Sequence, residues 1–295
     1  MAILATRALL IVNPGSRGGR RSLPGAVRAF QRAGVHVDVV MTEAPGHGGS
    51  VASERGAEYD FLFSLGGDGT AMEIVNAMRG TDRAISVLPG GTGNLLARAL
   101  GTPLNVGRAV TTLLRGTTRR IDLGVLGDGR CFAVGAGAGV DAAMLAGAPL
   151  PLRQRYGVGA YVVSAARELI HPKPFSVRAT VDGRVIERDD YVLALIVNVG
   201  VVLNGLLHLG PDISIDDGVL DLCVYSARHF ADAAVVASRL ALRRFRDDRR
   251  TAFASGRCIT IEAQPLVRTQ ADGELIGATP LTATVSPLAA LLQVP

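Results

Sequence analysis

Three glycines surround a single acid in the stretch SLGGDGT at residues 64–70, directly after the apolar run FLF. Glycine allows backbone conformations closed to other residues and lets the chain approach a ligand closely. A strand that leads through such a turn into a helix presents backbone N–H groups that bind phosphate. A tight turn capped by Asp68 or Thr70 explains a lone stretch of this kind better, so the rest of the chain has to decide.

Lysine is almost absent from the chain, and this limits the ways in which phosphate could be bound. Lys173 is the single lysine, and it lies between prolines in HPKPF. A P-loop needs lysine before Ser or Thr, and a protein kinase needs a lysine on a strand. Both classes are therefore excluded, as are Ser-x-x-Lys hydrolases. If ATP binds, backbone amides, arginines and metal must hold its phosphates.

Composition predicts an α/β protein of one large or two smaller domains, with 295 residues, 48% of them hydrophobic, and no tryptophan. The three cysteines are far apart and form no CxxC, so neither a disulfide framework nor a zinc site is expected. No targeting signal is recognisable at the N-terminus, and a cytoplasmic protein is expected. The uncharged stretch 191–211 is long enough to span a bilayer, but Asn, Gly and His interrupt it, which favours two buried strands.

The first ~125 residues alternate between strand and helix patterns. This alternation predicts an α/β domain over 1–125 with a doubly wound, mainly parallel sheet. Strands are expected in RALLIVNP, VHVDVVMT, DFLFSLGG and AISVLPGG, and helices in LPGAVRAFQRAG, GGSVASERGAE, TAMEIVNAMRG and TGNLLARALG.

After about Arg120 short strands joined by Asp-Gly or Gly turns predict a β-rich antiparallel domain over 126–280. We expect two helices within it, at 156–170 and 230–245, and we expect 280–295 to return to the first domain. No flexible linker separates the two domains, which favours a ligand cleft between them.

Four strand ends in the first domain carry glycine loops: VNPGS, TEAPGHGG, LGGDGT and LPGGTGN. Loops at the carboxyl ends of parallel strands converge on one crevice. One such loop is a turn, but four of them with Asn, Thr and Asp side chains make a phosphate site the better explanation.

These motifs resemble a known family. GGDGT with Glu73 and Asn76, followed by LPGGTGNLLARALG, is similar to the catalytic domain shared by diacylglycerol, sphingosine and ceramide kinases. VNP, GHGG, GAGAGVDA, LRQRYGVGAYVVSAARELI, PDISIDDGVLDL and ADGELI continue the match in order over almost the whole chain. The chain most resembles the soluble bacterial diacylglycerol-kinase-like lipid kinases. The resemblance implies an NAD-kinase/phosphofructokinase-like first domain and a lipid-substrate role for the second.

The resemblance also implies site residues. ATP would lie between the domains, with its magnesium on Asp68 and its phosphates wrapped by Gly66, Gly67, Gly69 and Thr70. The nucleotide side would be completed by Asn13, Thr42, Glu73, Thr92 and Asn94.

PDISIDDGVLDL has four acids in ten residues but lacks the glycine and final glutamate of a calcium-binding EF-hand. An ordinary Asp-Asp-Gly turn explains it well. By resemblance, the loop holds a structural magnesium through Asp217 and the carbonyls of Ser214 and Val219.

ADGELI is a plausible hairpin turn with Asp272 and Gly273 at its tip, yet related kinases place catalytic carboxylates here. An alcohol that attacks a phosphate gains from a carboxylate that takes its proton. Two residues apart on a strand, Asp272 and Glu274 would share a face. Spacing alone does not identify the base, and we favour Glu274.

The expected function is transfer of the γ-phosphate of ATP to a lipid hydroxyl, with diacylglycerol as leading acceptor. Its alternatives are an NAD kinase, which shares the GGDGT-type loop, and a catalytically silent lipid- or nucleotide-binding regulator. The expected partners are ATP and a lipid at a membrane surface, and one basic face of the arginine-rich chain would help the protein to reach that surface. A peripheral location at the inner membrane face and a homodimer are both left open. The chain has no nucleic-acid module. NVGVVLNGLLHLGPD departs from the family pattern, so the lipid itself is left open.

Overall fold

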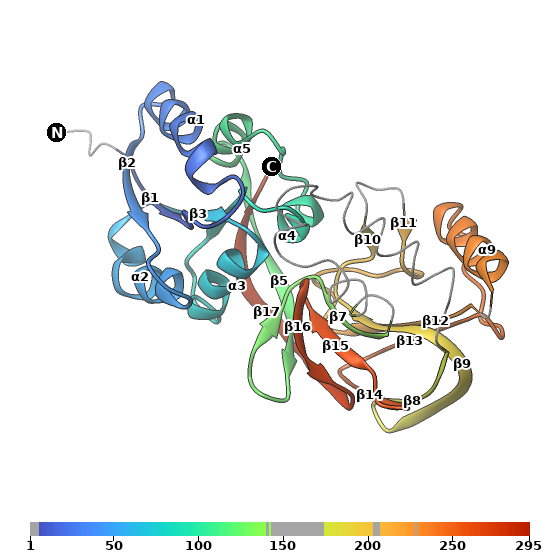
Figure 1. The fold of residues 1–295 in the computed structure, drawn as a ribbon. Helices are drawn as coiled ribbons and strands as arrows, with labels where there is room; N and C mark the ends of the chain where they lie inside the picture. Colours follow the sequence, from blue (N-terminus) through green and yellow to red (C-terminus); the bar gives the residue numbers. More distant parts are fainter. Residues whose placement is uncertain (1–5, 140–141, 143–173, 203–206, 228) are drawn as a thin grey trace. The chain divides into compact units, whose positions relative to one another are not determined.

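The computed structural model describes residues 6–139, 142, 174–202, 207–227 and 229–295 (Figure 1). The chain divides into two compact units. The first unit comprises Met1–Ile121 and Leu288–Pro295, and the second comprises Asp122–Pro287. The chain passes from one unit to the other inside strand β5 and inside strand β17, where Leu288 takes a positive φ of 48° directly after Pro287.

The first unit is built on a parallel sheet with the strand order β17-β4-β3-β1-β2. Its strands are β1 (Arg7–Val12), β2 (His36–Met41), β3 (Phe61–Gly66), β4 (Ile85–Pro89) and the end of β17 (Leu281–Val294). Its helices are α1 (Gly19–Arg32), α2 (His47–Arg55), the 3₁₀ turn η1 (Gly56–Glu58), α3 (Asp68–Ala77), α4 (Leu95–Ala99) and α5 (Val106–Leu113). The parallel pairing confirms the α/β class expected from the alternating pattern.

Both faces of this sheet are covered, since α1 and α5 lie on one face and α2 and α3 on the other (Figure 1). The central strands are consequently apolar on both sides: every residue of β1 from Ala8 to Val12 is buried. On the α1 side Phe30 packs edge-on against Phe63, with ring centroids 4.9 Å apart. The sheet therefore forms a rigid base whose strand ends present the glycine loops.

The second unit is antiparallel, with the order β16-β15-β7-β9-β8-β14-β17 and with β12 between β9 and β13. Its strands are β6 (Cys131–Phe132), β7 (Gly135–Gly139), β8 (Phe175–Val181), β9 (Arg184–Val197), β10 (Val201–Val202), β11 (Leu207–His208), β12 (Leu220–Ser226), β13 (Thr251–Gly256), β14 (Cys258–Gln264), β15 (Arg268–Ala271) and β16 (Glu274–Ala278), joined by the ends of β5 (Thr117–Leu126) and β17. A large buried cluster from β7–β9, β12 and β14 forms its core. The β-rich second region is thus as expected.

A smaller apolar cluster lies beneath helix α9 (Phe230–Ala241). Val236 and Leu240 of the helix are buried there together with Cys223 and Tyr225 of β12, and Phe245 packs against the cluster. The apolar inner face of the helix therefore packs against the sheet.

Several details differ from the sequence-based expectations. α1 begins at Gly19, four residues before the start expected at Leu23, so that Pro24 lies inside the helix. α5 and β13 were not predicted. β9 runs as a single strand over Arg184–Val197, with Asp190 at a positive φ of 65° inside it. The predicted helix 156–170 lies outside the described residues.

The stretch 191–211 forms the buried end of β9 followed by the short β10–β11 pair, so the expected second buried strand is wrong; residues 203–206 lie outside the described part. Among the residues that the structure describes, no helix has both the length and the hydropathy needed to cross a membrane.

Candidate functional site

The loop after β1 is tied to the loop after β3 by the side chain of Asn13. Its Nδ2 donates to the hydroxyl oxygen of Thr70, 2.9 Å away, and its Oδ1 accepts from the backbone N–H of Gly15 at 2.9 Å. Thr70 lies buried in the first turn of α3, one residue after Gly69. Two predicted site residues far apart in sequence are thus in direct contact.

Backbone hydrogen bonds join the loop after β4 to both of these loops. Gly18 N–H donates to the carbonyl of Gly90 at 2.7 Å, and Gly90 N–H donates to the carbonyl of Gly66 at 2.9 Å. A Cβ on Gly90 would lie 2.8 Å from the nitrogen of Gly66, and one on Gly91 would lie 2.5 Å from the Cα of Gly67. These glycines are therefore needed because the loops touch one another, a reason that the sequence did not reveal.

Asp68 is the first residue of α3, and its carboxylate faces the start of α4. Its Oδ1 accepts from Leu96 N–H at 3.2 Å. Burial raises the pKa of Asp68, against the lowering effect of backbone N–H groups of Leu96, Leu95 and Asn94. The charge of this carboxylate is thus incompletely compensated within the protein, and a cation beside it would be stabilising.

Asn94 shapes the loop that carries Thr92. It takes a positive φ of 50° at the start of α4, and its Oδ1 accepts from Gly91 N–H at 2.7 Å. Its Nδ2 donates to the Gly91 carbonyl at 3.0 Å, so both ends of the amide are used within the loop. Thr92 lies half-buried in the turn thus closed.

Thr42 and Glu73 lie together, beside the first turn of α2. Thr42 follows β2 directly and donates its backbone N–H to the Val12 carbonyl at 2.8 Å. A Cβ on Gly48 would lie 3.2 Å from Glu73 Oε2 and 3.6 Å from Thr42 Cγ2, so both side chains flank this glycine. The structure therefore groups these two residues around α2, next to the strand end that bears Asn13.

The ADGELI stretch forms the expected hairpin in the second unit. Ala271 pairs with Glu274, which leaves Asp272 and Gly273 as a two-residue turn with positive φ values of 44° and 84°. The Asp272 carboxylate accepts three backbone N–H groups, from residues 133–135, at 2.8, 3.0 and 3.0 Å. This carboxylate therefore holds the turn against the segment before β7.

The expectation that Asp272 and Glu274 share one face of a strand is wrong. Asp272 sits in the left-handed turn, whereas Glu274 is the first residue of β16 and is exposed. The hydrogen bonds that the Arg130 guanidinium donates to Asp128 and, more weakly, the charge of Glu274 raise the pKa of Arg130. In the described part of the chain Glu274 accepts no hydrogen bond, so its carboxylate is available to a ligand.

The Asp217 loop offers oxygen atoms rather than a carboxylate cluster. Asp217 Oδ1 accepts from Val219 N–H at 3.1 Å, and Ser214 donates its hydroxyl proton to Asp216 at 2.8 Å. Over the described ranges no three His, Cys, Asp or Glu side chains are grouped closely enough to hold a metal. Magnesium prefers oxygen ligands, and one carboxylate together with main-chain carbonyls would supply them. The loop therefore fits this ion only if main-chain carbonyl oxygens complete the site.

Two buried residues that the sequence analysis missed connect this loop to the Asp272 turn. Asp122 is fully buried on β5 and accepts from Gly218 N–H at 2.6 Å. Asn198, also fully buried, donates through Nδ2 to the carbonyls of Asp122 and Ala133 at 2.8 and 3.0 Å. A polar residue within an apolar strand, as in RIDLGV and LIVNV, was the available signal.

Asp221 is a further buried acid beside the Asp217 loop. Burial raises its pKa to about 6, a hydrogen bond from Ser255 opposes this, and the charge of Asp217 adds to it. Its Oδ2 is buried without a hydrogen-bond partner among the described residues. Positive charge nearby would stabilise both acids, which is a second feature consistent with a cation in this loop.

Family models match both units of the chain. The model described as the diacylglycerol kinase catalytic domain matches residues 7–126, and the YegS C-terminal NAD kinase beta sandwich-like domain matches residues 134–294. A protein named diacylglycerol kinase from Bacillus subtilis is 28% identical over 280 residues, which cover 93% of this chain and 91% of that protein. One of the same name from Staphylococcus aureus (strain MRSA252) is 27% identical over 282 residues, which cover 93% and 88%.

Solved structures agree with the fold. A putative diacylglycerol kinase from Bacillus anthracis str. Sterne superposes with a TM-score of 0.80 at 24% identity, covering 99% of this chain and 96% of that chain. A second structure of that description gives a TM-score of 0.77 over 99% and 98%.

Proposed function

The chain belongs to the diacylglycerol kinase catalytic-domain family of lipid kinases, and from this premise we propose that it transfers the γ-phosphate of ATP to a lipid hydroxyl, with diacylglycerol as the acceptor. The product would be phosphatidic acid. The observation that carries the proposal is the connected set of glycine loops around Asp68 at the ends of parallel strands. Use of ATP follows from the family; the acceptor and the residue roles are part of the proposal.

Backbone N–H groups and Asp68 would bind the nucleotide in this site. Gly66, Gly67 and Gly69 leave the backbone open beside the first turn of α3, where N–H groups favour phosphate. Thr70 and Asn13 already hold each other, so their part is to fix the loop on which these amides lie. The rigid parallel sheet beneath keeps the arrangement in place before ATP arrives.

Magnesium fits this site because Asp68 is a partly buried carboxylate whose charge is incompletely compensated. The ion would be held by Asp68 and by phosphate oxygens, and when bound it would neutralise charge on the phosphates. In a site without lysine, this role falls to the ion and to the backbone N–H groups. Thr42, Glu73, Thr92 and Asn94 would line the nucleotide side of the loops.

Glu274 is our candidate for the base. Its carboxylate would accept the proton of the lipid hydroxyl as the oxygen bonds to the γ-phosphorus, while the bond from that phosphorus to the β–γ bridging oxygen breaks and ADP leaves. The choice of Glu274 over Asp272 rests on their surroundings: Asp272 already accepts three backbone N–H groups, whereas Glu274 is exposed. Asp272 would act as a positioning residue that fixes the turn from which Glu274 projects.

A second metal is proposed for the Asp217 loop, bound by Asp217 and the carbonyls of Ser214 and Val219. Its part would be structural, since Asp122 and Asn198 join this loop to the segment that the Asp272 carboxylate holds.

An NAD kinase is the second candidate. The GGDGT loop and the match of residues 134–294 to an NAD kinase beta sandwich-like domain favour it. The match of residues 7–126 to the diacylglycerol kinase catalytic domain weighs against it.

An acceptor screen with γ-labelled ATP tests the proposal. The purified chain is incubated with magnesium and, separately, with diacylglycerol, ceramide, sphingosine and NAD. We expect label in the diacylglycerol arm, and we expect no label with Asp68→Asn. Label only with NAD would establish the second candidate, and label in no arm would leave the catalytically silent regulator as the better description.

A further inference from the structure

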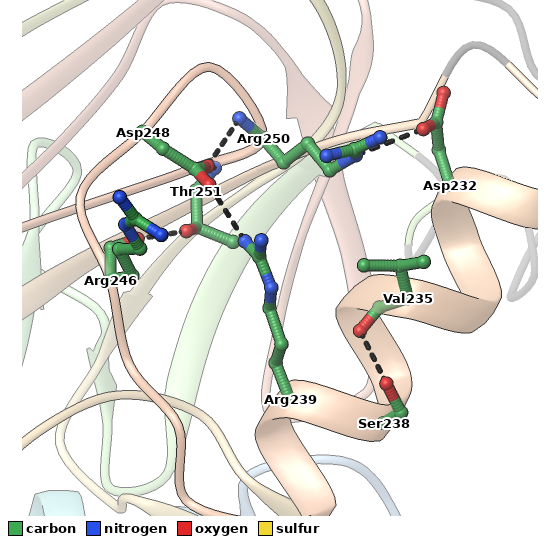
Figure 2. Close-up of polar contacts among 8 residues, drawn as sticks. All are labelled: Asp232, Val235, Ser238, Arg239, Arg246, Asp248, Arg250 and Thr251. Carbon is green, nitrogen blue, oxygen red and sulfur yellow. Dashed lines mark hydrogen bonds and ion pairs between the residues drawn. The ribbon is translucent and has the colours of Figure 1, made fainter.

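The exposed side of α9 carries no charged residue. Its exposed positions are Ala231, Ala234, Val235, Ala237, Ser238 and Ala241. The Ser238 hydroxyl donates to the Val235 carbonyl of its own helix at 2.8 Å, so this polar group is already satisfied (Figure 2). Because the buried side of the helix is apolar as well, α9 lacks the charged face that a helix of this kind normally turns to water.

The two charged residues within α9 are half-buried and paired with the chain that follows. Arg239 contacts Asp248 at 2.8 Å, and Arg250 contacts Asp232 at 2.9 Å (Figure 2). These ion pairs consume two acids together with two arginines and hold residues 242–250 against the helix. Asp247 is a third, exposed acid of the segment, and it accepts from the backbone N–H of Phe253 at 3.1 Å. The exposed arginines of the segment outnumber it: Arg243, Arg244, Arg246 and Arg249.

Unpaired arginines gather directly after the helix. Arg244 and Arg246 are exposed, and within the described ranges neither has a carboxylate partner. Phe245 between them packs against Phe253, with ring centroids 5.9 Å apart, which anchors the segment and leaves its two neighbours outside. Leu242, beside them, is 63% exposed.

A shallow cavity of about 420 Å³ lies on this surface, and its lining includes Val235, Leu242, Arg244 and Arg246. Guanidinium groups bind phosphate oxygens, and the apolar side chains beside them suit the carbon atoms next to a phosphate. The cavity thus combines the two chemistries that a phospholipid headgroup presents at the surface of a bilayer.

We propose that the α9 surface, formed by the exposed side of α9 and residues 242–246, docks the protein on an anionic phospholipid bilayer. The inference deepens the proposed function and rests on it, since that function requires a lipid acceptor. Arg244 and Arg246 provide the attraction, and Leu242 and Val235 enter the headgroup region. The small side chains of α9 let the helix lie close to the surface without contributing much apolar area.

Charge is the reason to assign a bilayer rather than a second copy of this chain. Two copies joined through this surface would bring arginines towards arginines, and like charges oppose association. Because few large apolar side chains take part, the arginines contribute most of the binding, which must therefore weaken as salt is added.

Vesicle co-sedimentation without ATP tests the docking. Wild type is compared with an Arg244→Gln/Arg246→Gln double variant, on vesicles of phosphatidylcholine alone and of phosphatidylcholine mixed with phosphatidylglycerol. The matched control is Arg184→Gln/Arg268→Gln, which removes two exposed arginines from the same unit. Each basic residue near an anionic surface contributes about 1 kcal/mol, so the α9 double variant should bind the mixed vesicles about 30-fold more weakly.

The control double variant should bind like wild type, and vesicles of phosphatidylcholine alone should bind neither protein. Leu242→Ser is an independent variant that keeps every charge, and we expect it to weaken binding about fivefold. Equal losses in both double variants would mean that net charge alone matters, and unchanged binding in the α9 variant would also overturn the proposal. So would a dimer that the α9 variant dissociates while vesicle binding persists.

Transfer to a short-chain diacylglycerol in solution separates this inference from the proposed function. The α9 double variant should phosphorylate that acceptor at the wild-type rate while losing activity on vesicles. Transfer in solution without vesicle binding by wild type would overturn the docking surface alone. Vesicle binding without any transfer would overturn the proposed function and leave the docking surface standing.

Discussion

Asp68 in the first unit and Asp272 in the second both follow the same short pattern, an acid next to glycine after a strand, yet their surroundings are opposite. Asp68 is the half-buried first residue of α3, where burial outweighs the N–H groups that face its carboxylate, so its pKa is raised. Asp272 lies in a half-buried hairpin turn, and its carboxylate accepts three backbone N–H groups. The same residue type is thus available for a cation in one unit and committed to the fold in the other.

This difference predicts which carboxylate can be removed with a loss of activity but not of stability. A carboxylate that the fold does not fully compensate can be removed without loss of structure, whereas one that satisfies backbone groups cannot. Each prediction below changes one side of the comparison, in order from the largest expected effect to the smallest.

Asp68→Asn should reduce phosphoryl transfer on the order of 10³-fold or more, because the magnesium that neutralises the phosphates loses its carboxylate. The raised pKa means that the native state binds the Asp68 proton more tightly than the unfolded chain does. The stability contribution is therefore present at acidic pH and is lost as pH rises through the folded pKa. At neutral pH without magnesium, the variant should melt no lower than wild type, and a clearly lower melting temperature would contradict the account.

Glu274→Gln should lower kcat by about 10²–10⁴-fold, the usual contribution of a positioned base. Since the side chain is exposed and the change keeps its shape, the melting temperature should stay the same. Glu187→Gln, at another exposed position of the second unit, is the control and should change neither quantity. Turnover near the wild-type rate in Glu274→Gln would remove this residue from the mechanism.

Asp272→Asn should act on stability first. Asparagine tolerates the positive φ of this position, so the change removes the charge and one of the two accepting oxygens without straining the backbone. We expect a loss of about 2 kcal/mol or more in the free energy of unfolding, measured with urea. Activity should also fall, because the turn that carries Glu274 becomes less ordered. A variant with the same free energy of unfolding as wild type would show that these three hydrogen bonds do not stabilise the protein.

Asp217→Asn should have the smallest effect and only in the presence of magnesium. If the loop binds the ion, magnesium raises the melting temperature of wild type, and the variant loses most of this increase. Without the ion the two proteins should melt alike. An equal response of both proteins to magnesium would exclude Asp217 as its ligand.

The sequence sufficed for the parallel sheet and its four glycine loops because both depend on local patterns, alternation and glycine placement. It also gave the hairpin at Asp272 and Gly273, whose two-residue spacing selects the turn. It did not reveal that Gly90 and Gly91 are needed for contact between loops, or that Asp272 is committed to residues 133–135, because these depend on segments far away in sequence.

The sequence did not identify Asp122 and Asn198 as site residues, for a related reason. Each stands in an apolar strand that a local pattern describes completely, and its partners come from other strands and loops. An unmatched polar residue inside a buried strand signals such a connection, but the sequence does not say to what it connects.

Calorimetric titration of magnesium and ATP into Asp68→Asn and Glu274→Gln, with transfer to diacylglycerol measured on the same samples, tests the central claim most directly. The account predicts a division between the two units. Asp68→Asn loses nucleotide binding and transfer together, whereas Glu274→Gln binds ATP like wild type and fails only to transfer phosphate. Unimpaired ATP binding by Asp68→Asn, or an equal loss of binding in both variants, would contradict the account.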